Sequence, residues 1–294
     1  MSAAALPARS ILTVDVEDWF HILDLPSAPG RSDWDRLPSR VEGNFRRLLD
    51  IFDEHQVRVT CFFLGWIAER HREIVRDAAR RGHEIASHGY GHTLVYEMTP
   101  EEFARDASDS RKLLEDISGS SVLGYRSAGF STTESTPWFF DKLLEAGYAY
   151  DSSIFPAARQ HGGQKTAACA PYLVKREPWP FVEFPITVAE VLGKRICFFG
   201  GGYLRLFPYW IVRKMAGRVH REGRPVIFYV HPREIDPDQP RMKMGLMRKF
   251  KSYVNLRTTE PKIRGIVSDF ELTTFRDYLR ENPEMTENAG LMEA

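Results

Sequence analysis

Short apolar runs and amphipathic segments alternate along this chain. Seven runs have the length and composition of buried strands, at residues 11–16, 57–64, 84–87, 122–125, 148–150, 182–186 and 226–230. Between them apolar residues recur at helical spacing, over residues 41–52, 66–81, 99–117, 136–146 and 205–222. This alternation shows no break in composition. It predicts an α/β fold, namely one domain with a parallel sheet that is barrel-like rather than split.

Local signals predict several helix ends. Thr99-Pro100-Glu101-Glu102 combines an N-cap threonine, a proline in the first turn and a glutamate at the third helical position, which is typical of a strong helix start. Ser39 is a candidate N-cap for the helix over 41–52. Gly82 is expected to end the second helix.

Polar side chains follow five of the predicted strands. Asp15, Glu17 and Asp18 follow the first strand, His88 and His92 the third, Arg126 the fourth, Asp151 the fifth and His231 the seventh. The carboxyl ends of parallel strands meet at one face of an α/β fold. We therefore expect these side chains to gather in one site.

The two histidines carry the clearest chemical signal. His88 and His92 lie four residues apart in a loop, so both imidazoles can face one point. Two converging imidazoles are a common way to hold zinc or a similar divalent ion. Such a site needs a third ligand, and the acids after the first strand are the candidates.

Composition fits an ordinary globular chain of 294 residues, of which 43% are hydrophobic. No run of 18 apolar residues occurs, so no membrane span is expected. The first ten residues lack a basic start and an apolar core, and we interpret them as a frayed tail rather than a secretory signal. Cys61, Cys169 and Cys197 are odd in number and widely spaced, which argues against disulfides and favours a reducing, cytoplasmic setting.

Charge is distributed unevenly, although the formal net charge is zero. Residues 205–264 contain 15 Lys and Arg against 5 Asp and Glu. A basic region of this size can face an anionic substrate or lipid headgroups, or it can pair with the acidic remainder of the chain. Residues 242–254 mix apolar and basic side chains. They can lie on the inner membrane as a peripheral contact or pack on the barrel as an outer helix.

The ordered motifs resemble those of the NodB-homology polysaccharide deacetylases, carbohydrate esterase family four. The resemblance covers residues 11–234 and rests on the acidic group near Asp15, the H-x-x-x-H pair, Arg126, Asp151-Ser152-Ser153 and the late His231. The variants around Asp15 and His231 resemble an exosortase-associated (PEP-CTERM) exopolysaccharide subgroup, and residues 241–281 resemble its C-terminal extension. The resemblance implies an α/β fold, a single-domain distorted (β/α)7-type barrel. With its C-terminal helical extension from about residue 241 it would cover residues 10–281, between tails at 1–9 and 282–294.

The resemblance implies a metal-dependent N-deacetylase that acts on N-acetylhexosamine units of a polysaccharide or its lipid-linked precursor. The metal would be Zn²⁺, with Co²⁺, Ni²⁺, Fe²⁺ or Mn²⁺ as alternatives, held by His88, His92 and an acid. Asp15 would be the base, paired with Arg126. His231 would be the general acid, oriented by Asp151. The expected partner is the glycan and not a nucleic acid.

The acidic ligand is not fixed by the sequence. In an extended strand Asp15 and Glu17 share a face and Asp18 does not, but a turn would reverse this. We favour Asp15 as base and Asp18 as ligand, with Glu17 as the alternative ligand. If Glu17 and Asp18 instead replace the adjacent acidic pair of the family, Glu17 becomes the base.

Other functions compatible with the residues are hydrolysis of a small cyclic amide or ureide on the same fold, and an inactive glycan-binding module. Trp19, Phe20 and Trp179 lie on predicted loops and are candidates for stacking against sugars.

Overall fold

A computed structural model describes residues 9–23, 25–159, 162–174 and 181–285. Its central sheet follows the order β10-β1-β2-β3-β4-β5-β7-β6, with β11 also paired to β1. All pairings are parallel except that of β6 with β7. The strands are β1 (Ser10–Val16), β2 (Thr60–Phe63), β3 (Glu84–Ser87), β4 (Gly124–Tyr125), β5 (Tyr150–Asp151), β6 (Tyr172–Val174), β7 (Phe181–Glu183), β10 (Val226–Val230) and β11 (Leu272–Thr273). A separate hairpin pairs β8 (Ala189–Val191) with β9 (Lys194–Ile196).

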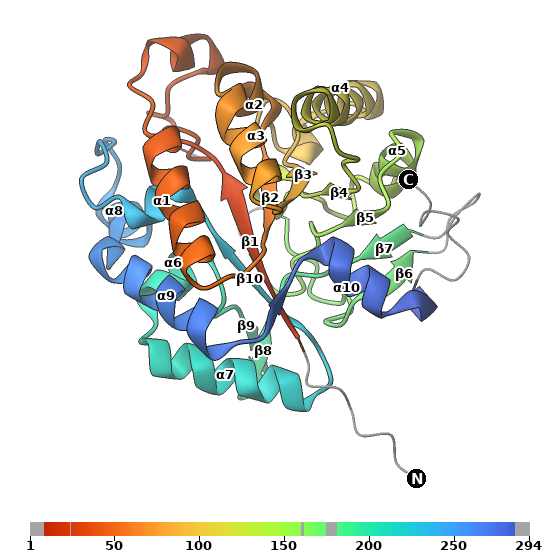
Figure 1. Cartoon of the computed structure of the whole chain (residues 1–294), viewed down its shortest axis with the longest axis vertical. Coiled ribbons are helices and arrows are strands. Elements are labelled where there is room, and N and C mark those ends of the chain that lie inside the picture. Colours follow the sequence, from red (N-terminus) through yellow and green to blue (C-terminus); the bar gives the residue numbers. More distant parts are fainter. Residues whose placement is uncertain (1–8, 24, 160–161, 175–180, 286–294) are drawn as a thin grey trace.

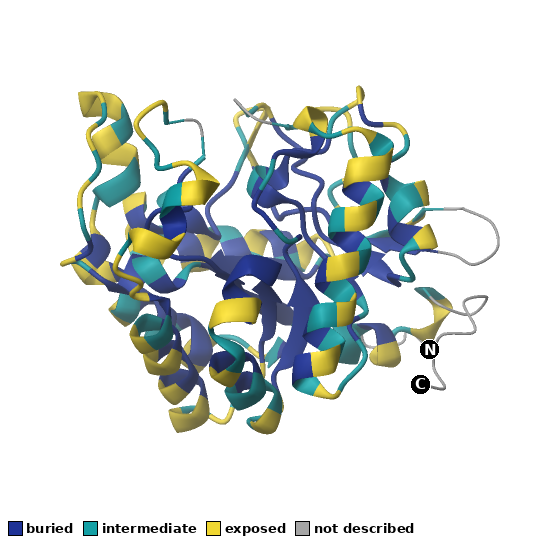
Figure 2. Ribbon diagram, turned by 90° about the horizontal axis from the view of Figure 1, so that it is seen from above, coloured by how far each residue is buried: buried dark blue, intermediate teal, exposed yellow. Residues whose placement is uncertain are grey.

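Helices surround this curved sheet (Figure 1), and its strands are buried at the centre (Figure 2). The predicted distorted α/β barrel is therefore confirmed. The helices are α1 (Val41–Glu54), α2 (Gly65–Arg70), α3 (Arg72–Arg80), α4 (Pro100–Ser118), α5 (Phe139–Glu145), α6 (Gly201–Leu206), α7 (Tyr209–Arg221), α8 (Leu246–Tyr253), α9 (Thr259–Asp269) and α10 (Phe275–Glu281). None of the helices in the described ranges is long and apolar enough to cross a bilayer.

Two predicted helices are each split in the structure. The helix expected over 66–81 breaks at His71, whose backbone lies at φ −122° and ψ 47°. The helix expected over 205–222 breaks at Pro208, because a proline disfavours helical geometry in the residue before it, and Phe207 is extended with ψ 139°. The capping box at Thr99 is confirmed, with its side chain accepting from the Glu102 N–H.

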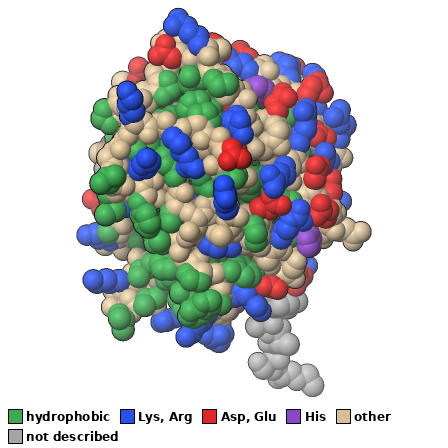
Figure 3. All heavy atoms as spheres, turned by 90° about the vertical axis from the view of Figure 1, so that its left-hand side faces the viewer, with side chains coloured by type: hydrophobic (Ala, Val, Ile, Leu, Met, Phe, Trp, Pro, Cys, Tyr) green, Lys and Arg blue, Asp and Glu red, His purple; other side chains and the backbone are tan. Residues whose placement is uncertain are grey.

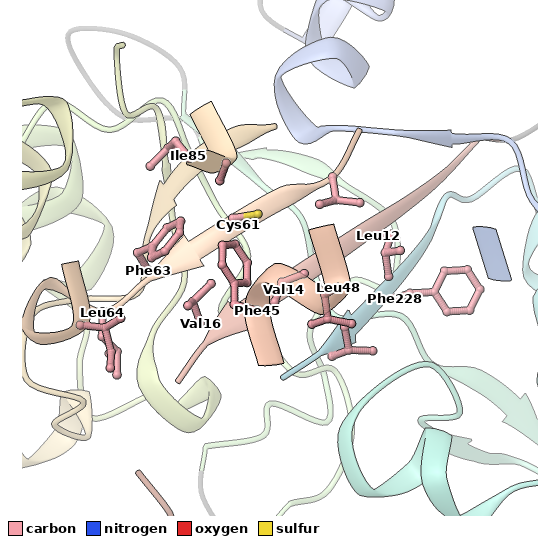
Figure 4. Packing of buried hydrophobic residues seen from close by; sticks show 14 of the residues in the cluster. Leu12, Val14, Val16, Phe45, Leu48, Cys61, Phe63, Leu64, Ile85 and Phe228 are labelled. Atoms are coloured by element: carbon pink, nitrogen blue, oxygen red, sulfur yellow. The ribbon is translucent and has the colours of Figure 1, made fainter. Parts of the chain in front are cut away.

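Alternation along the strands divides the core into two layers. Leu12, Val14 and Val16 of β1 face outward and pack with Phe45 and Leu48 of α1 (Figure 4). The intervening side chains face the barrel interior, where apolar residues from several strands form a second cluster that includes Ile11, Phe62, Tyr150, Phe184 and Phe275. At the carboxyl ends of the strands, the inward positions are polar.

The C-terminal extension is integral to the sheet. β11 pairs with Ser10 and Ile11, the part of β1 that β2 leaves free, because β2 begins opposite Thr13. By contrast, α8 contains no buried residue, and Leu246, Met247 and Phe250 are all exposed. Hydrophobic and basic side chains intermingle on the face of the molecule shown in Figure 3, and most acidic side chains lie toward one edge. Contact with a membrane through this region stays a prediction.

Candidate functional site

The acidic part of the site comes from the end of β1. Asp15 is an inward-facing residue of the strand, and Glu17 follows two positions later, with its N–H donating to the Asp15 carbonyl at 3.0 Å. The alternation of side chains directs both carboxylates to the interior. Both are almost fully buried, so both need partners.

The histidines lie on the loop after β3, and their orientation is fixed by neighbouring segments. His88 Nδ1 donates to the Arg126 carbonyl at 2.7 Å, and this hydrogen bond leaves the Nε2 lone pair directed into the site. His92 adopts a positive φ of 52°, which costs a non-glycine residue about 1–2 kcal/mol. The loop tolerates this strain because Asp106 of α4 accepts hydrogen bonds from the N–H groups of Tyr90 and Gly91.

Replacement of Asp106 tests this support. We expect Asp106→Asn to weaken metal affinity by about tenfold, because the loop that carries both histidines loses a charged acceptor. The fold should persist. Affinity would be measured by competition with a chromogenic chelator, with the exposed Asp109→Asn on the same helix as control. Equal affinities in the two variants would show that the loop holds its shape without Asp106.

Glu17, His88 and His92 form a cluster suited to a metal ion. Their ligand atoms lie within 4.8 Å of one another, and Glu17 Oε1 is 3.2 Å from His88 Nε2 and 3.0 Å from His92 Nε2. His92 Nε2 is buried and forms no hydrogen bond. Two imidazole nitrogens and a carboxylate thus converge, and there is no proton to bridge each of their contacts. A divalent cation satisfies such a set of lone pairs.

The electrostatics of Glu17 agree with this arrangement. Burial alone would raise the pKa of Glu17, but the charges of His92 and His231 and the close contacts with His88 and His92 hold that pKa well below its usual value. Glu17 is therefore ionised at neutral pH, as a metal ligand must be.

Asp18, the favoured acidic ligand, does not join the histidines. Its carboxylate turns away to the start of α1, where it accepts from Ser39 Oγ at 2.6 Å and from the N–H groups of Arg40 and Val41. It caps this helix from a distant segment, and Arg40 rather than Ser39 is the N-cap residue. The expected roles are thus corrected: Glu17 lies with the histidines, and Asp18 stabilises a helix terminus.

Arg126 and Asp15 form a buried ion pair. Arg126 Nη1 donates to Asp15 Oδ1 and to Thr13 Oγ1, each at 2.7 Å, while Nε donates to the Ser152 carbonyl. The guanidinium also lies 4.2 Å from the centroid of the Phe62 ring. These contacts fix the orientation of Asp15 and leave its Oδ2 free toward the cavity.

His231 faces the same carboxylates from β10. Its Nε2 lies 3.9 Å from Asp15 Oδ2 and 3.7 Å from Glu17 Oε1. Glu234 orients this imidazole, because Glu234 Oε2 lies 3.2 Å from His231 Nδ1. Glu234 in turn forms an ion pair with Arg205. Sequence reasoning missed Glu234, although a signal was present in His231-Pro232-Arg233-Glu234. His231 and Glu234 occupy the N-cap and third helical positions of a capping box, with a proline between them in the first turn, and the structure contains this box.

Asp151 therefore does not orient His231 as expected. It neighbours Tyr150, which faces the barrel interior, so Asp151 faces the other way and lies opposite Glu183 in the sheet. Its carboxylate accepts from the N–H and Oγ of Ser153. Burial raises the pKa of Asp151 to about 6, and burial together with the Asp151 charge raises that of Glu183 further. The two carboxyl groups share a proton.

This pair predicts a pH-dependent stability. The pKa of Asp151 is higher in the folded than in the unfolded protein, so the folded state holds this proton more tightly. The resulting contribution to the free energy of unfolding is complete below about pH 4 and is lost as the pH rises through about 6. Two pKa units correspond to roughly 3 kcal/mol. Glu183→Gln keeps a donor toward Asp151 without needing the shared proton, so its free energy of unfolding should fall less between pH 4 and 7. Urea titrations of wild type, this variant and the exposed Glu190→Gln would measure the difference, and parallel profiles would contradict it.

A cavity of about 570 Å³ opens in front of these groups. Asp15, Glu17, His88, His92 and His231 all line it, so the structure brings five of the eight candidate residues to one space. Arg126 supports them from behind, whereas Asp18 and Asp151 lie elsewhere.

The aromatic candidates do not form a sugar-binding surface at this cavity. Trp19 and Phe20 are buried in the core, and Trp179 lies outside the described residues. His21, which had no predicted role, lines the cavity instead. Its Nδ1 accepts from the Asp18 N–H at 2.9 Å, so Nε2 carries the proton, and this buried Nε2 has no partner among the described residues.

Two family models match successive parts of the sequence. The polysaccharide deacetylase family matches residues 33–150. The chain contains a polysaccharide deacetylase domain. A domain of unknown function, DUF3473, matches residues 152–280, and it is compatible with the exosortase-associated subgroup, which stays a prediction. The boundary between the two matches falls at β5, and strands from both sides pair in one sheet.

Curated relatives and solved structures that resemble this chain include polysaccharide deacetylases. Two peptidoglycan-N-acetylglucosamine deacetylases of Bacillus cereus are 30% identical over 73 residues (25% of this chain, 26% of theirs) and 26% identical over 102 residues (35% and 46%). The chain thus matches less than half the length of either. A Mycobacterium smegmatis protein described as a polysaccharide deacetylase shares the fold (TM-score 0.65, 19% identity, 99% and 96% covered), as does the allantoinase Puue (0.55, 18%, 81% and 71%).

Proposed function

We propose that this protein is a metal-dependent hydrolase that removes N-acetyl groups from N-acetylhexosamine units of a bacterial exopolysaccharide or its lipid-linked precursor. The observation that carries the proposal is the cluster of Glu17, His88 and His92, with Asp15 and His231 beside it at the head of one cavity. The match of residues 33–150 to the polysaccharide deacetylase family and the similarity to the Bacillus cereus deacetylases support it.

Each residue has a distinct part in the chemistry. Glu17, His88 and His92 would hold the ion, with Zn²⁺ the best match to two imidazoles and one carboxylate. A bound divalent cation lowers the pKa of a water molecule and polarises the carbonyl of an acetamido group. Asp15 Oδ2 accepts the proton of the attacking water, because Arg126 occupies Oδ1.

The amide nitrogen needs a proton to leave as an amine, and His231 Nε2 supplies it. Glu234 holds Nδ1, so Nε2 is the atom that exchanges a proton with the site. Burial, with contributions from Arg233 and His88, lowers the pKa of His231 to about 4. The imidazole is thus neutral at rest and takes up a proton during the reaction. Asp15 Oδ2, which holds the proton of the attacking water, lies 3.9 Å from Nε2 and supplies it.

Elemental analysis combined with an acetate assay tests the proposal. Wild type should hold about one divalent ion per chain and release acetate from N-acetylated oligosaccharides. His88→Ala should lose both, while His55→Ala at the end of α1 keeps both. Metal without acetate release, but with hydrolysis of a cyclic ureide, would replace the substrate class. Wild type without metal after reconstitution would contradict the proposal and favour a glycan-binding module.

A further inference from the structure

The cavity that contains the metal-binding cluster is strongly basic on its other walls. Five basic side chains line it against three acidic ones, and they are Arg159, Arg205, Arg233, Arg248 and Lys251. All five lie within residues 152–280, the part of the chain that matches the domain of unknown function. Four of the five, Arg205, Arg233, Arg248 and Lys251, belong to the basic region at residues 205–264, and the fold brings them to one space with Arg159.

The three acids of the cavity are already occupied. Asp15 is bound to Arg126, Glu17 faces the two histidines, and Glu234 is paired with Arg205 and His231. Within the described part of the chain, neither Arg233 nor Arg248 forms an ion pair. The Nε atoms of both are buried without a hydrogen-bond partner.

Two guanidinium groups without an ion-pair partner lie in one cavity, and both side chains are half-buried. A charge that is partly withdrawn from water is stabilised when a ligand of opposite charge pairs with it. Burial lowers the pKa of Arg233, the charge of Glu17 opposes this shift, and the charge of Arg248 adds to it, so the two cations repel each other. A guanidinium presents a planar set of donors that matches a phosphate or a carboxylate.

Both arginines are held in place relative to the reacting groups. Arg233 lies two residues after His231, in the turn that the Glu234 capping box fixes. Arg248 of α8 donates from Nη2 to the carbonyl of Leu23, in the loop after β1. An anion bound between them would have a defined position relative to Glu17 and His231.

We propose that Arg233 and Arg248 form an anion-binding subsite, and that the substrate is an N-acetylated sugar that carries a phosphate or a carboxylate group. The proposed substrate rests on the deacetylase function argued above, whereas the anion-binding subsite does not. The barrel strands up to β3 supply the metal ligands, and the region matching the domain of unknown function supplies the selectivity for charge.

Anion binding can be measured without catalysis. Inorganic pyrophosphate and N-acetylglucosamine 1-phosphate would be titrated calorimetrically into chelator-treated protein. We expect saturable binding that weakens with salt, and about tenfold or greater loss of affinity in Arg233→Gln and in Arg248→Gln, since hydrogen bonds to a charged group are worth about 1.5–3 kcal/mol. Arg218→Gln, on the outer helix α7, is the control, and melting curves of each variant would check folding.

Acetate release then identifies the source of the anion. Wild-type kcat/KM would be compared for N-acetylglucosamine 1-phosphate, an N-acetylated oligosaccharide containing a uronate, and a neutral N-acetylglucosamine trimer. We expect one charged substrate to exceed the neutral one by at least about tenfold, and Arg233→Gln to reduce that ratio through KM. The better charged substrate distinguishes phosphate from carboxylate.

The possible failures are distinct. Absence of anion binding by wild type, or equal affinity in all three arginine variants, would overturn the subsite. Anion binding without acetate release from any of the three sugars would leave the subsite standing and contradict the deacetylase function. Equal release from charged and neutral sugars would support the deacetylase and overturn the selectivity.

Discussion

Glu17→Gln should abolish metal binding and acetate release together, whereas Asp18→Asn should preserve both. Glu17 is the carboxylate 3.0–3.2 Å from both histidine nitrogens, and a neutral amide is a poor ligand for zinc. A single change in a residue that supports a metal ligand lowers metal affinity by about 10–100-fold. Replacement of a direct ligand should therefore lower metal affinity by more than about 100-fold. Activity should fall by at least as much.

The adjacent Asp18 provides a matched control. Within the described ranges, its carboxylate accepts from the segment that begins α1 and from the Trp19 N–H. Asp18→Asn should therefore cost about 1 kcal/mol of stability, as loss of a helix cap does. Elemental analysis, acetate release and urea unfolding would be measured on both variants. Metal loss in Asp18→Asn with retention in Glu17→Gln would reverse the assignment.

The sequence analysis favoured Asp18 as the acidic ligand, whereas in the structure Glu17 is the acid that lies with the two histidines. Alternation places Asp15 and Glu17 on one face, and the structure keeps that face through Glu17. What the sequence could not reveal is the demand for Asp18 elsewhere. Its partners, Ser39 and Arg40, lie about twenty residues away, and only the folded chain shows that they meet.

Alternation also explains why Asp151 was misplaced. The residue follows a strand in the expected order, but strand order alone does not say which way a side chain points. Tyr150 faces the interior, so Asp151 must face outward. The replacement, Glu234, was readable from its spacing to His231 and Pro232, by the same rule that correctly identified the helix start at Thr99.

The basic region shows a different limit. The excess of Lys and Arg after residue 205 was visible, and with it the choice between an anionic ligand and surface ion pairs. Only the structure shows that α6, α8 and the turn after β10 aim Arg205, Arg248 and Arg233 into one cavity. Similarly, Trp19 and Phe20 were expected on a loop surface, but both are buried. The Phe20 ring packs against Trp19, Trp34 and Trp66.

Phe275→Ala should destabilise the whole protein by about 3–5 kcal/mol. The side chain is fully buried in the barrel interior, with ring centroids of Phe184 and Tyr150 at 4.7 and 5.1 Å. Its N–H donates to Thr60 Oγ1 of β2. The next residue donates its N–H to the buried Glu84 of β3. A segment near the end of the chain thus fills the base of a barrel whose metal-binding residues come from its first strands.

Phe250→Ala is the matched control, because Phe250 is also a phenylalanine but is 52% exposed on α8. Its truncation should change the free energy of unfolding by no more than about 0.5 kcal/mol. Urea unfolding would be followed by circular dichroism and by tryptophan fluorescence, and we expect both signals to shift together in Phe275→Ala. Coincident transitions mean that the deacetylase match and the DUF3473 match unfold as one cooperative unit. A cost below about 1 kcal/mol, or two separated transitions, would show instead that residues 33–150 are stable without the extension.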